Sequence, residues 1–191
     1  MRALLLLIAA AWLGVAHGAE VAGVKLPDRT RVDAGGPELV LNGAGLRTRF
    51  FIKVYAAGLY LEKRSQTPAA VLALAGPKRV AMHLLRDLSA QQILEAVHDG
   101  IDANNSPAER ETLKPQLGEF DAVMIQLGPI KKGDVVTLDY LPGAGTVVTV
   151  NGQAKGKPIA GEALYQALLR VWLGDSPVQE DLKKELLGQP G

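Results

Sequence analysis

Two largely apolar stretches near the start of the chain indicate a β-hairpin. Residues 38–46 are apolar apart from Glu38, Asn42 and two glycines, and β-branched and aromatic residues are frequent in 50–61, which favours strands. Only a few residues join the two stretches, as in a tight hairpin. Because a glycine weakens a strand interior, we expect Gly58 to interrupt the second strand.

Further strands are expected on both sides of a helical middle. Residues 20–26 and 78–85 each have the pattern of a short strand. Residues 135–140 and 146–150 flank a glycine-rich turn, and 154–157 follow another turn, which predicts a three-stranded antiparallel unit. Strands grouped toward the two ends of a sequence favour an α+β fold over alternating βαβ units.

The middle of the chain has two predicted helices with clear start signals. Apolar residues three and four apart predict a helix over 89–103, with Ser89 as its N-cap. Ser106 is followed three positions later by a glutamate, as in a capping box, and starts a helix over 107–127. We expect Pro115 to interrupt that helix.

Three other helices are predicted. Thr67 caps a short helix that Gly76 closes, and residues 159–172 have a strongly amphipathic pattern. A last helix is expected to be capped by residues 175–177 and to run through Leu187, with its leucines packed on the core.

The first residues have the layout of an export signal. Arg2 precedes a run of 13 apolar residues over 4–16, and Ala16 and Gly18 supply the small residues of a cleavage site. The run is shorter than the roughly 20 residues of a membrane span. We therefore expect residues 1–18 to be a signal peptide and 19–191 to be a single domain that is periplasmic or secreted and does not span a membrane.

Composition excludes several function classes. Removal of Arg2 with the signal leaves as many basic as acidic residues, so no overall field attracts nucleic acid or anionic lipid, and Lys53, Lys78 and Arg79 read as scattered charges. The absence of cysteine excludes a thiol nucleophile or thiol redox role. His83 and other histidines lack metal-ligand spacing, and no phosphate-loop or dinucleotide motif occurs, so we expect no metal and no cofactor.

Three segments together resemble the chalcone isomerase superfamily, in particular its bacterial exported members. They are LNGAGLRTRFFIKVYAAGLYLE (41–62), DYLPGAGTVVTVNGQAKGKPIAG (139–161) and ALLRVWLGDSPVQEDLKKELLG (167–188). The resemblance implies an open-faced β-sandwich, in which a large antiparallel sheet curves around a layer of helices with a ligand cleft between them. It implies three possible roles: closing a chalcone into a flavanone, binding a fatty acid, or neither.

Arg47 and Tyr55 are the candidate ligand-binding residues. Arg47 matches the cleft arginine of the enzyme and lipid-binding branches, and its guanidinium suits a carboxylate or a developing phenolate. Tyr55 matches a tyrosine of the fatty-acid-binding branch, where the isomerases have a threonine. Across a tight turn both side chains are expected to face one cleft. From the residues alone, a solvated strand arginine and a core tyrosine bonded to backbone are the alternatives.

Two polar contacts of the plant isomerases are missing. Ala90–Gln92 resembles their pattern, but Ile93 stands where they have a tyrosine and Gly100 lies near the position of an asparagine. Apolar replacements suit an aliphatic ligand better than a phenolic one.

The leading hypothesis is a non-catalytic protein that binds a small apolar carboxylate, such as a fatty acid, through Arg47 and Tyr55. An isomerase or intramolecular lyase with Arg47 as its catalytic residue is one alternative. An interaction protein whose cleft is filled by its own side chains is another. The sequence leaves the oligomeric state and the identity of the ligand open.

Overall fold

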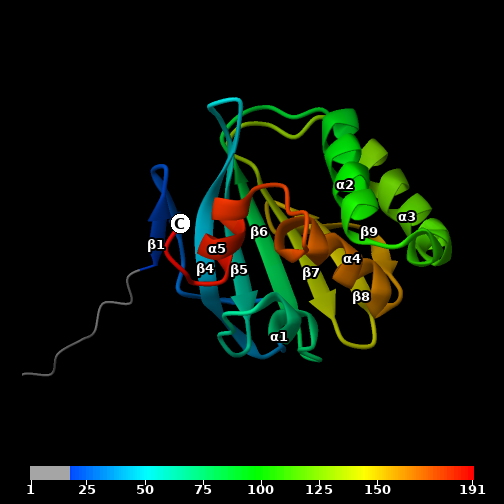
Figure 1. Ribbon diagram of the computed structural model, residues 1–191, viewed down its shortest axis with the longest axis horizontal. Helices are drawn as coiled ribbons and strands as arrows, with labels where there is room; N and C mark the ends of the chain where they lie inside the picture. The colour runs from blue at the N-terminus through cyan, green and yellow to red at the C-terminus, as the bar shows by residue number, and fades with distance from the viewer. Residues whose placement is uncertain (1–17) are drawn as a thin grey trace, which may run out of the picture.

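The computed structural model describes residues 18–191 and contains a curved seven-stranded sheet with helices packed on one face (Figure 1). The predicted signal peptide lies outside the described residues except for Gly18. The large sheet is antiparallel throughout and its strands follow chain order, from β3 to β9. The predicted α+β class is confirmed. The strands are β1 (Ala19–Val21), β2 (Val24–Leu26), β3 (Arg29–Arg31), β4 (Glu38–Arg49), β5 (Ile52–Leu61), β6 (Lys78–Leu84), β7 (Val135–Leu141), β8 (Gly145–Val150) and β9 (Gln153–Ile159).

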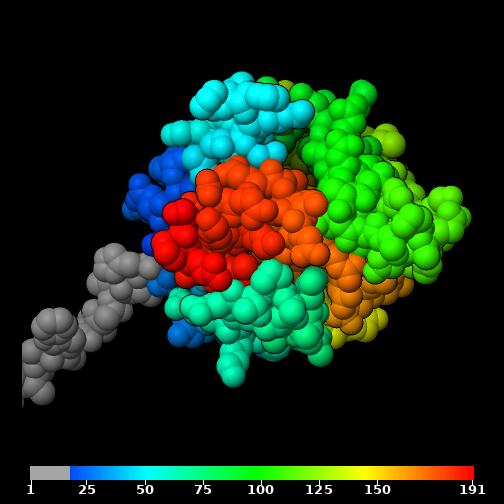
Figure 2. Space-filling view, in the orientation of Figure 1, coloured from blue at the N-terminus to red at the C-terminus, as the bar shows by residue number. Residues whose placement is uncertain are grey.

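Five helices accompany the sheet in the described part of the chain. They are α1 (Pro68–Leu72), α2 (Ala90–Asn104), α3 (Pro107–Leu127), α4 (Glu162–Leu173) and α5 (Glu180–Leu186). The main core lies between the sheet and the helices, with α4 buried at its centre. In a space-filling view the orange α4 and red α5 lie between the cyan β4–β5 hairpin and the green α2 (Figure 2).

The predicted β4–β5 hairpin is confirmed, but Gly58 does not interrupt it. Gly58 pairs with Ala44 on one side and Ala81 on the other, so the strand is continuous. A Cβ at this position would lie 2.7 Å from Leu26 Cδ2 and 3.0 Å from the ring of Tyr60. The glycine therefore allows β1–β2 to pack closely on the outer face of the sheet.

The single strand predicted over 20–26 is two strands. β1 and β2 form a separate small sheet, joined at Ala22 and Gly23, which both have positive φ. This hairpin covers a second, smaller core on the face of the large sheet away from the helices, built around Leu26 and Tyr60. The turn was missed because Ala22 is not a residue that usually adopts positive φ.

The helix starts at Ser89 and Ser106 are confirmed, each with a capping box. Pro115 lies inside α3 without ending it, which is tolerable because its missing N–H removes only one hydrogen bond while Leu113 and Leu117 remain buried on either side. The capped start of α3 also favours continuation of the helix.

Two predicted helix ends are wrong. α1 stops at Ala73 and not at Gly76, which instead lies against the Glu62 carboxylate. Residues 175–177 do not cap the last helix, because Ser176 N donates to Asn104 Oδ1 and the chain continues to Gln179 before α5 begins. The leucines of α5 are buried on the core as expected.

Lys78 and Arg79 are not scattered surface charges. Lys78 is fully buried, with Nζ donating to Leu74 O and lying 4.6 Å from the centre of the Tyr140 ring. Arg79 donates to both carboxylate oxygens of buried Asp139, at 2.7 and 2.8 Å. Both cations have structural partners that the linear sequence does not show.

Among residues 18–191, no helix combines the length and apolar character needed to cross a bilayer.

Candidate ligand-binding cavity

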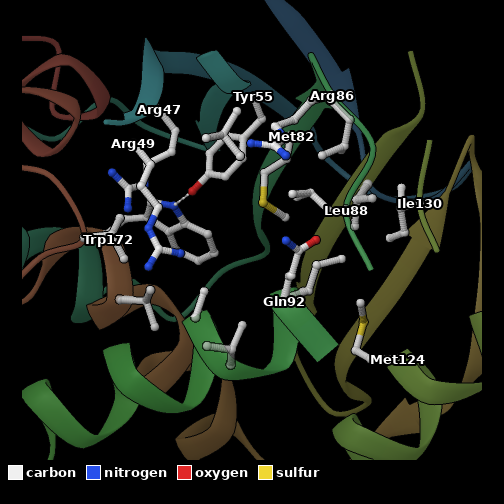
Figure 3. Close-up of a pocket in the computed structure, with 18 of the residues that line it drawn as sticks. Arg47, Arg49, Tyr55, Met82, Arg86, Leu88, Gln92, Met124, Ile130 and Trp172 are labelled. Atoms are coloured by element: carbon white, nitrogen blue, oxygen red, sulfur yellow. Dashed lines mark hydrogen bonds between the residues drawn. The ribbon is translucent and has the colours of Figure 1, made fainter. Parts of the chain in front are cut away.

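A cavity of about 350 Å³ opens between the end of the β4–β5 hairpin, β6, β7 and the helices α2, α3 and α4. Volumes of this order are at the lower end of those of small-molecule sites. Most of the lining is aliphatic or aromatic, and the close-up shows Met82, Leu88 and Ile130 on one side and Trp172 on the other (Figure 3). The apolar lining residues include Val54, Met82, Leu84, Leu88, Ile93, Val97, Phe120, Met124, Ile130, Val136, Leu138, Val171 and Trp172.

Arg47 and Tyr55 lie together on this cavity. They are direct partners across the β4–β5 ladder, and both line the cavity. Past this pair the register shifts, because Thr48 pairs with Lys53 and leaves Val54 as an extra residue on β5. The bulge places Val54 and Tyr55, which are consecutive, on the same cavity, although neighbours in a regular strand face opposite sides.

The Tyr55 hydroxyl is held by a side chain and not by backbone. Trp172 Nε1 donates to Tyr55 Oη at 2.9 Å (Figure 3). Burial raises the pKa of Tyr55, while the Trp172 bond and the Arg47 charge lower it to a smaller extent. The hydroxyl is therefore neutral at physiological pH, and with its oxygen already accepting from Trp172 its own proton is available to a ligand.

Arg47 is half-buried and oriented by two acceptors. Its Nη1 donates to Thr48 O and to Gln179 Oε1, the latter at 3.3 Å. Within the described residues its Nε and Nη2 make no hydrogen bond, so three N–H groups remain for an anion. This environment differs from that of a freely solvated strand arginine.

Gln179 and Trp172 are the site residues that sequence reasoning missed. Besides contacting Arg47, Gln179 accepts from Thr48 N at 2.9 Å and donates to Leu46 O at 3.1 Å, which fastens the start of α5 to β4. Trp172 was expected only as an apolar position of its helix. No local signal marks either residue, because each reaches Arg47 or Tyr55 from more than 110 positions away.

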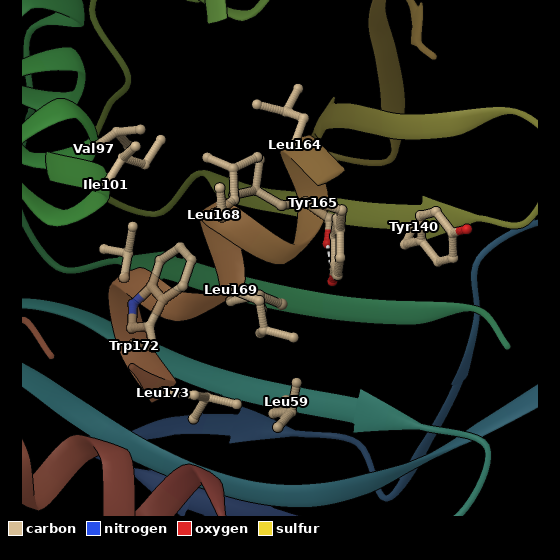
Figure 4. Packing of buried hydrophobic residues seen from close by; sticks show 14 of the residues in the cluster. Leu59, Val97, Ile101, Tyr140, Leu164, Tyr165, Leu168, Leu169, Trp172 and Leu173 are labelled. Atoms are coloured by element: carbon tan, nitrogen blue, oxygen red, sulfur yellow. Dashed lines mark hydrogen bonds between the residues drawn. The ribbon is translucent and has the colours of Figure 1, made fainter. Parts of the chain in front are cut away.

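The rigid placement of Trp172 follows from the packing of α4. Leu168, Leu169 and Leu173 of the same helix are buried, as are Val97 and Ile101 of α2, and Figure 4 shows these side chains gathered around the α4 ribbon. A helix packed on several sides holds its indole in one position. Trp172 thus fixes the orientation of the Tyr55 ring.

The remaining polar lining is cationic or neutral. Arg49 and Arg86 line the cavity with Arg47, and no acidic residue of 18–191 does. Gln92 also lines it, with its Oε1 engaged by Ser89 N in the helix cap. Ile93 contributes apolar surface, whereas Gly100 lies elsewhere, and a Cβ there would come within 2.7 Å of Val171. The arrangement suits an apolar molecule with an anionic group.

The cavity offers little for acid–base or metal chemistry. Arginines and Tyr55 are its titratable lining residues, and no histidine or carboxylate of the described part of the chain, the usual general bases, lines it. His83 and His98 do not line it, and His98 Nε2 instead lies 2.9 Å from the Asp121 carboxylate. No cluster of three potential metal ligands occurs in the part of the chain that the structure describes.

Comparisons with known proteins agree with this architecture. A family model described as chalcone isomerase-like matches residues 18–188. The crystal structure of a fatty-acid-binding protein from Arabidopsis thaliana is similar, with a TM-score of 0.61 and 15% sequence identity over 86% of this chain and 92% of that one. At that identity the likeness shows a shared fold alone. No curated protein matches the chain.

Proposed function

The chain belongs to the chalcone isomerase-like family, and from this premise we propose that it is a non-catalytic protein that binds a small apolar carboxylate, such as a fatty acid. Arg47 and Tyr55 anchor the carboxylate, and the apolar cavity holds the hydrocarbon tail. The name of the similar Arabidopsis thaliana protein, a fatty-acid-binding protein, supports this class of ligand.

The observation that carries the proposal is that Arg47 and Tyr55 have hydrogen-bond donors without partners beside an apolar cavity that no acidic residue of the described chain lines. Arg47 has free N–H groups beside the Tyr55 hydroxyl, and the two come from register partners on adjacent strands. A carboxylate can accept from both a guanidinium and a hydroxyl, and charge-assisted hydrogen bonds of this kind are the strong ones. Methylene groups of the tail gain free energy by leaving water for the apolar walls.

Calorimetric titration with dodecanoate tests the anchor. Arg47→Ala is expected to weaken binding about 10- to 100-fold, because a hydrogen bond to a charged group contributes about 1.5–3 kcal/mol. Dodecanol has a similar tail without the charge, so its affinity is expected to be the same for both proteins. Arg31→Ala, at an exposed arginine of β3, serves as the matched control. Equal dodecanoate affinity in Arg47→Ala and the parent protein would remove the anchoring role.

The two alternatives make different predictions. An isomerase would use Arg47 to stabilise an oxyanion, so a chalcone cyclisation rate that is above the spontaneous rate and lost in Arg47→Ala would favour it. Among the described residues, no histidine or carboxylate lines the cavity to act as a general base, which favours binding over catalysis. A protein without a ligand would have its cleft filled by side chains, and the open volume beside Arg47 favours the ligand-binding reading instead.

We further propose that the protein is one of the exported bacterial members and works in the periplasm or outside the cell. The N-terminal charge, apolar run and small residues support export. Cleavage after Gly18 would leave all the described strands intact, since β1 begins at Ala19. Cell fractionation with N-terminal sequencing tests this, and a cytoplasmic protein that retains Met1 would contradict it.

A further inference from the structure

The turn between β4 and β5 presents three consecutive large apolar residues to solvent. Phe50 is 83% exposed, Phe51 103% and Ile52 51%. We call these three residues the hairpin tip. Exposed apolar side chains gathered in one place, as opposed to scattered singly, mark interaction sites.

The backbone of the tip departs from ordinary turn chemistry. Phe50 and Phe51 have φ angles of 48° and 64°, in the left-handed region that two-residue turns usually fill with glycine or asparagine. Bulky residues are rare there, and such strain is found where it has a use. Phe50 and Phe51 expose two aromatic rings to water, which lowers solubility, and their positive φ angles do not favour the turn. Neither solubility nor turn stability therefore accounts for phenylalanine at these positions.

Positively charged residues flank the tip along the hairpin. Arg47, Arg49 and Lys53 flank it, and no acidic residue occurs in the chain between Glu38 and Glu62. The Arg49 guanidinium lies 5.6 Å from the centre of the Phe50 ring. The near-zero net charge predicts no attraction to anionic lipid, but the charged residues of the hairpin itself near the tip are all positive.

The tip also forms part of the cavity mouth. Phe50 and Ile52 line the cavity together with Arg49 and Arg86, while Phe51 and Lys53 do not. In the close-up Arg49 lies beside Arg47 and Trp172, and Arg86 lies beyond Tyr55, near Met82 (Figure 3). A surface that engages the tip therefore lies next to the entrance.

We propose that the hairpin tip docks on an anionic lipid bilayer. The Phe50 and Phe51 rings enter the interfacial region, and Arg49 and Lys53 contact lipid phosphates. Exposed aromatics flanked by cations match the apolar interior and negative surface of such a membrane. Docking in this orientation turns the cavity mouth toward the bilayer, so an amphiphile can enter the cavity directly from lipid. Docking itself does not depend on the carboxylate binding proposed above.

Vesicle flotation tests the docking surface. The protein is expected to float with vesicles of equal amounts of phosphatidylglycerol and phosphatidylcholine, not with phosphatidylcholine alone, and to dissociate as salt rises. Phe51→Asn keeps a residue suited to positive φ and is expected to weaken binding about tenfold. Lys53→Gln is expected to weaken it about fivefold.

Matched changes elsewhere separate the tip from general effects. Ile125→Ser removes another exposed apolar side chain, 65% exposed on α3, and Lys157→Gln removes a charge on exposed β9; both are expected to float like the parent protein. Absence of flotation by the parent protein, or equal losses in these controls, would overturn the proposal. So would size-exclusion chromatography showing a dimer that Phe51→Asn dissociates. Dodecanoate affinity should be unchanged in Phe51→Asn and Lys53→Gln, so failure of docking is distinguishable from failure of carboxylate binding.

Discussion

The hydrogen bond between Trp172 and Tyr55 joins a side chain of the central helix to one of the hairpin. Its 2.9 Å length and partly buried position mean that losing the acceptor leaves the indole N–H without a partner. An unpaired buried donor costs more than the bond itself contributes.

Tyr55→Phe is therefore expected to lower the free energy of unfolding by about 1–3 kcal/mol. Urea unfolding measures the change. Trp172→Phe should lower the free energy of unfolding less in the Tyr55→Phe variant than in the parent protein, because it removes the indole N–H that Tyr55→Phe leaves without an acceptor. Strict additivity of the two substitutions would show that the bond contributes nothing to stability.

At this scale, sequence reasoning found part of the cavity. The spacing of Arg47 and Tyr55 across a tight turn predicted that they face one cleft, and they are ladder partners on the cavity. Their roles came from the family resemblance and stay a prediction. Gln179 and Trp172 were missed because tertiary packing, not local spacing, brings them to the hairpin.

At the scale of elements, close approach of α2 to α4 depends on Gly100. A Cβ built there lies 2.7 and 3.0 Å from the two Val171 methyl carbons, so an added methyl group needs the helices to move apart. Gly118 in α3 has open space around the same position and is exposed. The two glycines form a natural pair for comparison.

Gly100→Ala is expected to destabilise the fold by about 1–2 kcal/mol, since overpacking costs about 1–3 kcal/mol and improved helix propensity returns at most about 1 kcal/mol. Gly118→Ala should stabilise it by about 0.5–1 kcal/mol. Denaturant midpoints compare the two. If the denaturant midpoints of both variants shift in the same direction, the close contact with Val171 does not determine the effect of Gly100→Ala.

Most elements follow from local patterns, and the exceptions have tertiary causes. Ser89 and Ser106 start helices by bonds within four residues, so their signals are readable in the sequence. Gly58 lies within a continuous strand, where Leu26 packs closely against it. Residues 175–177 do not cap a helix, because Ser176 N donates to Asn104 Oδ1. Neither partner is near in sequence. The sequence pattern therefore predicted the presence of each helix and strand better than the residues at which it begins and ends.

At the scale of the whole molecule, burial of tyrosines couples stability to alkaline pH. Burial raises the pKa of Tyr60 to about 12, and it raises the pKa values of Tyr55, Tyr140 and Tyr165 as well. Between the unfolded value near 10 and these folded values, the unfolded chain releases protons that the folded chain keeps. Stability is therefore intact below pH 10 and falls as the pH rises above it.

Tyr60→Phe removes one of these contributions. At pH 11 the variant is expected to lose about 1.4 kcal/mol less stability, relative to pH 8, than the parent protein does. Urea unfolding followed by circular dichroism at both pH values measures this difference. Parallel losses in the two proteins would mean that Tyr60 ionises equally in the folded and unfolded chains.

The strand order of the large sheet determines the order in which its parts can form during synthesis. Each strand of the large sheet pairs with the next strand along the chain, so each pair of strands can form once its second strand leaves the ribosome or a translocation channel. Trp172 and Gln179 come after β9, the last strand of the large sheet, in α4 and at the start of α5. A nascent chain with a complete sheet still lacks the groups that orient Tyr55 and Arg47, so the cavity acquires its polar end only after α4 and the start of α5 have been synthesised.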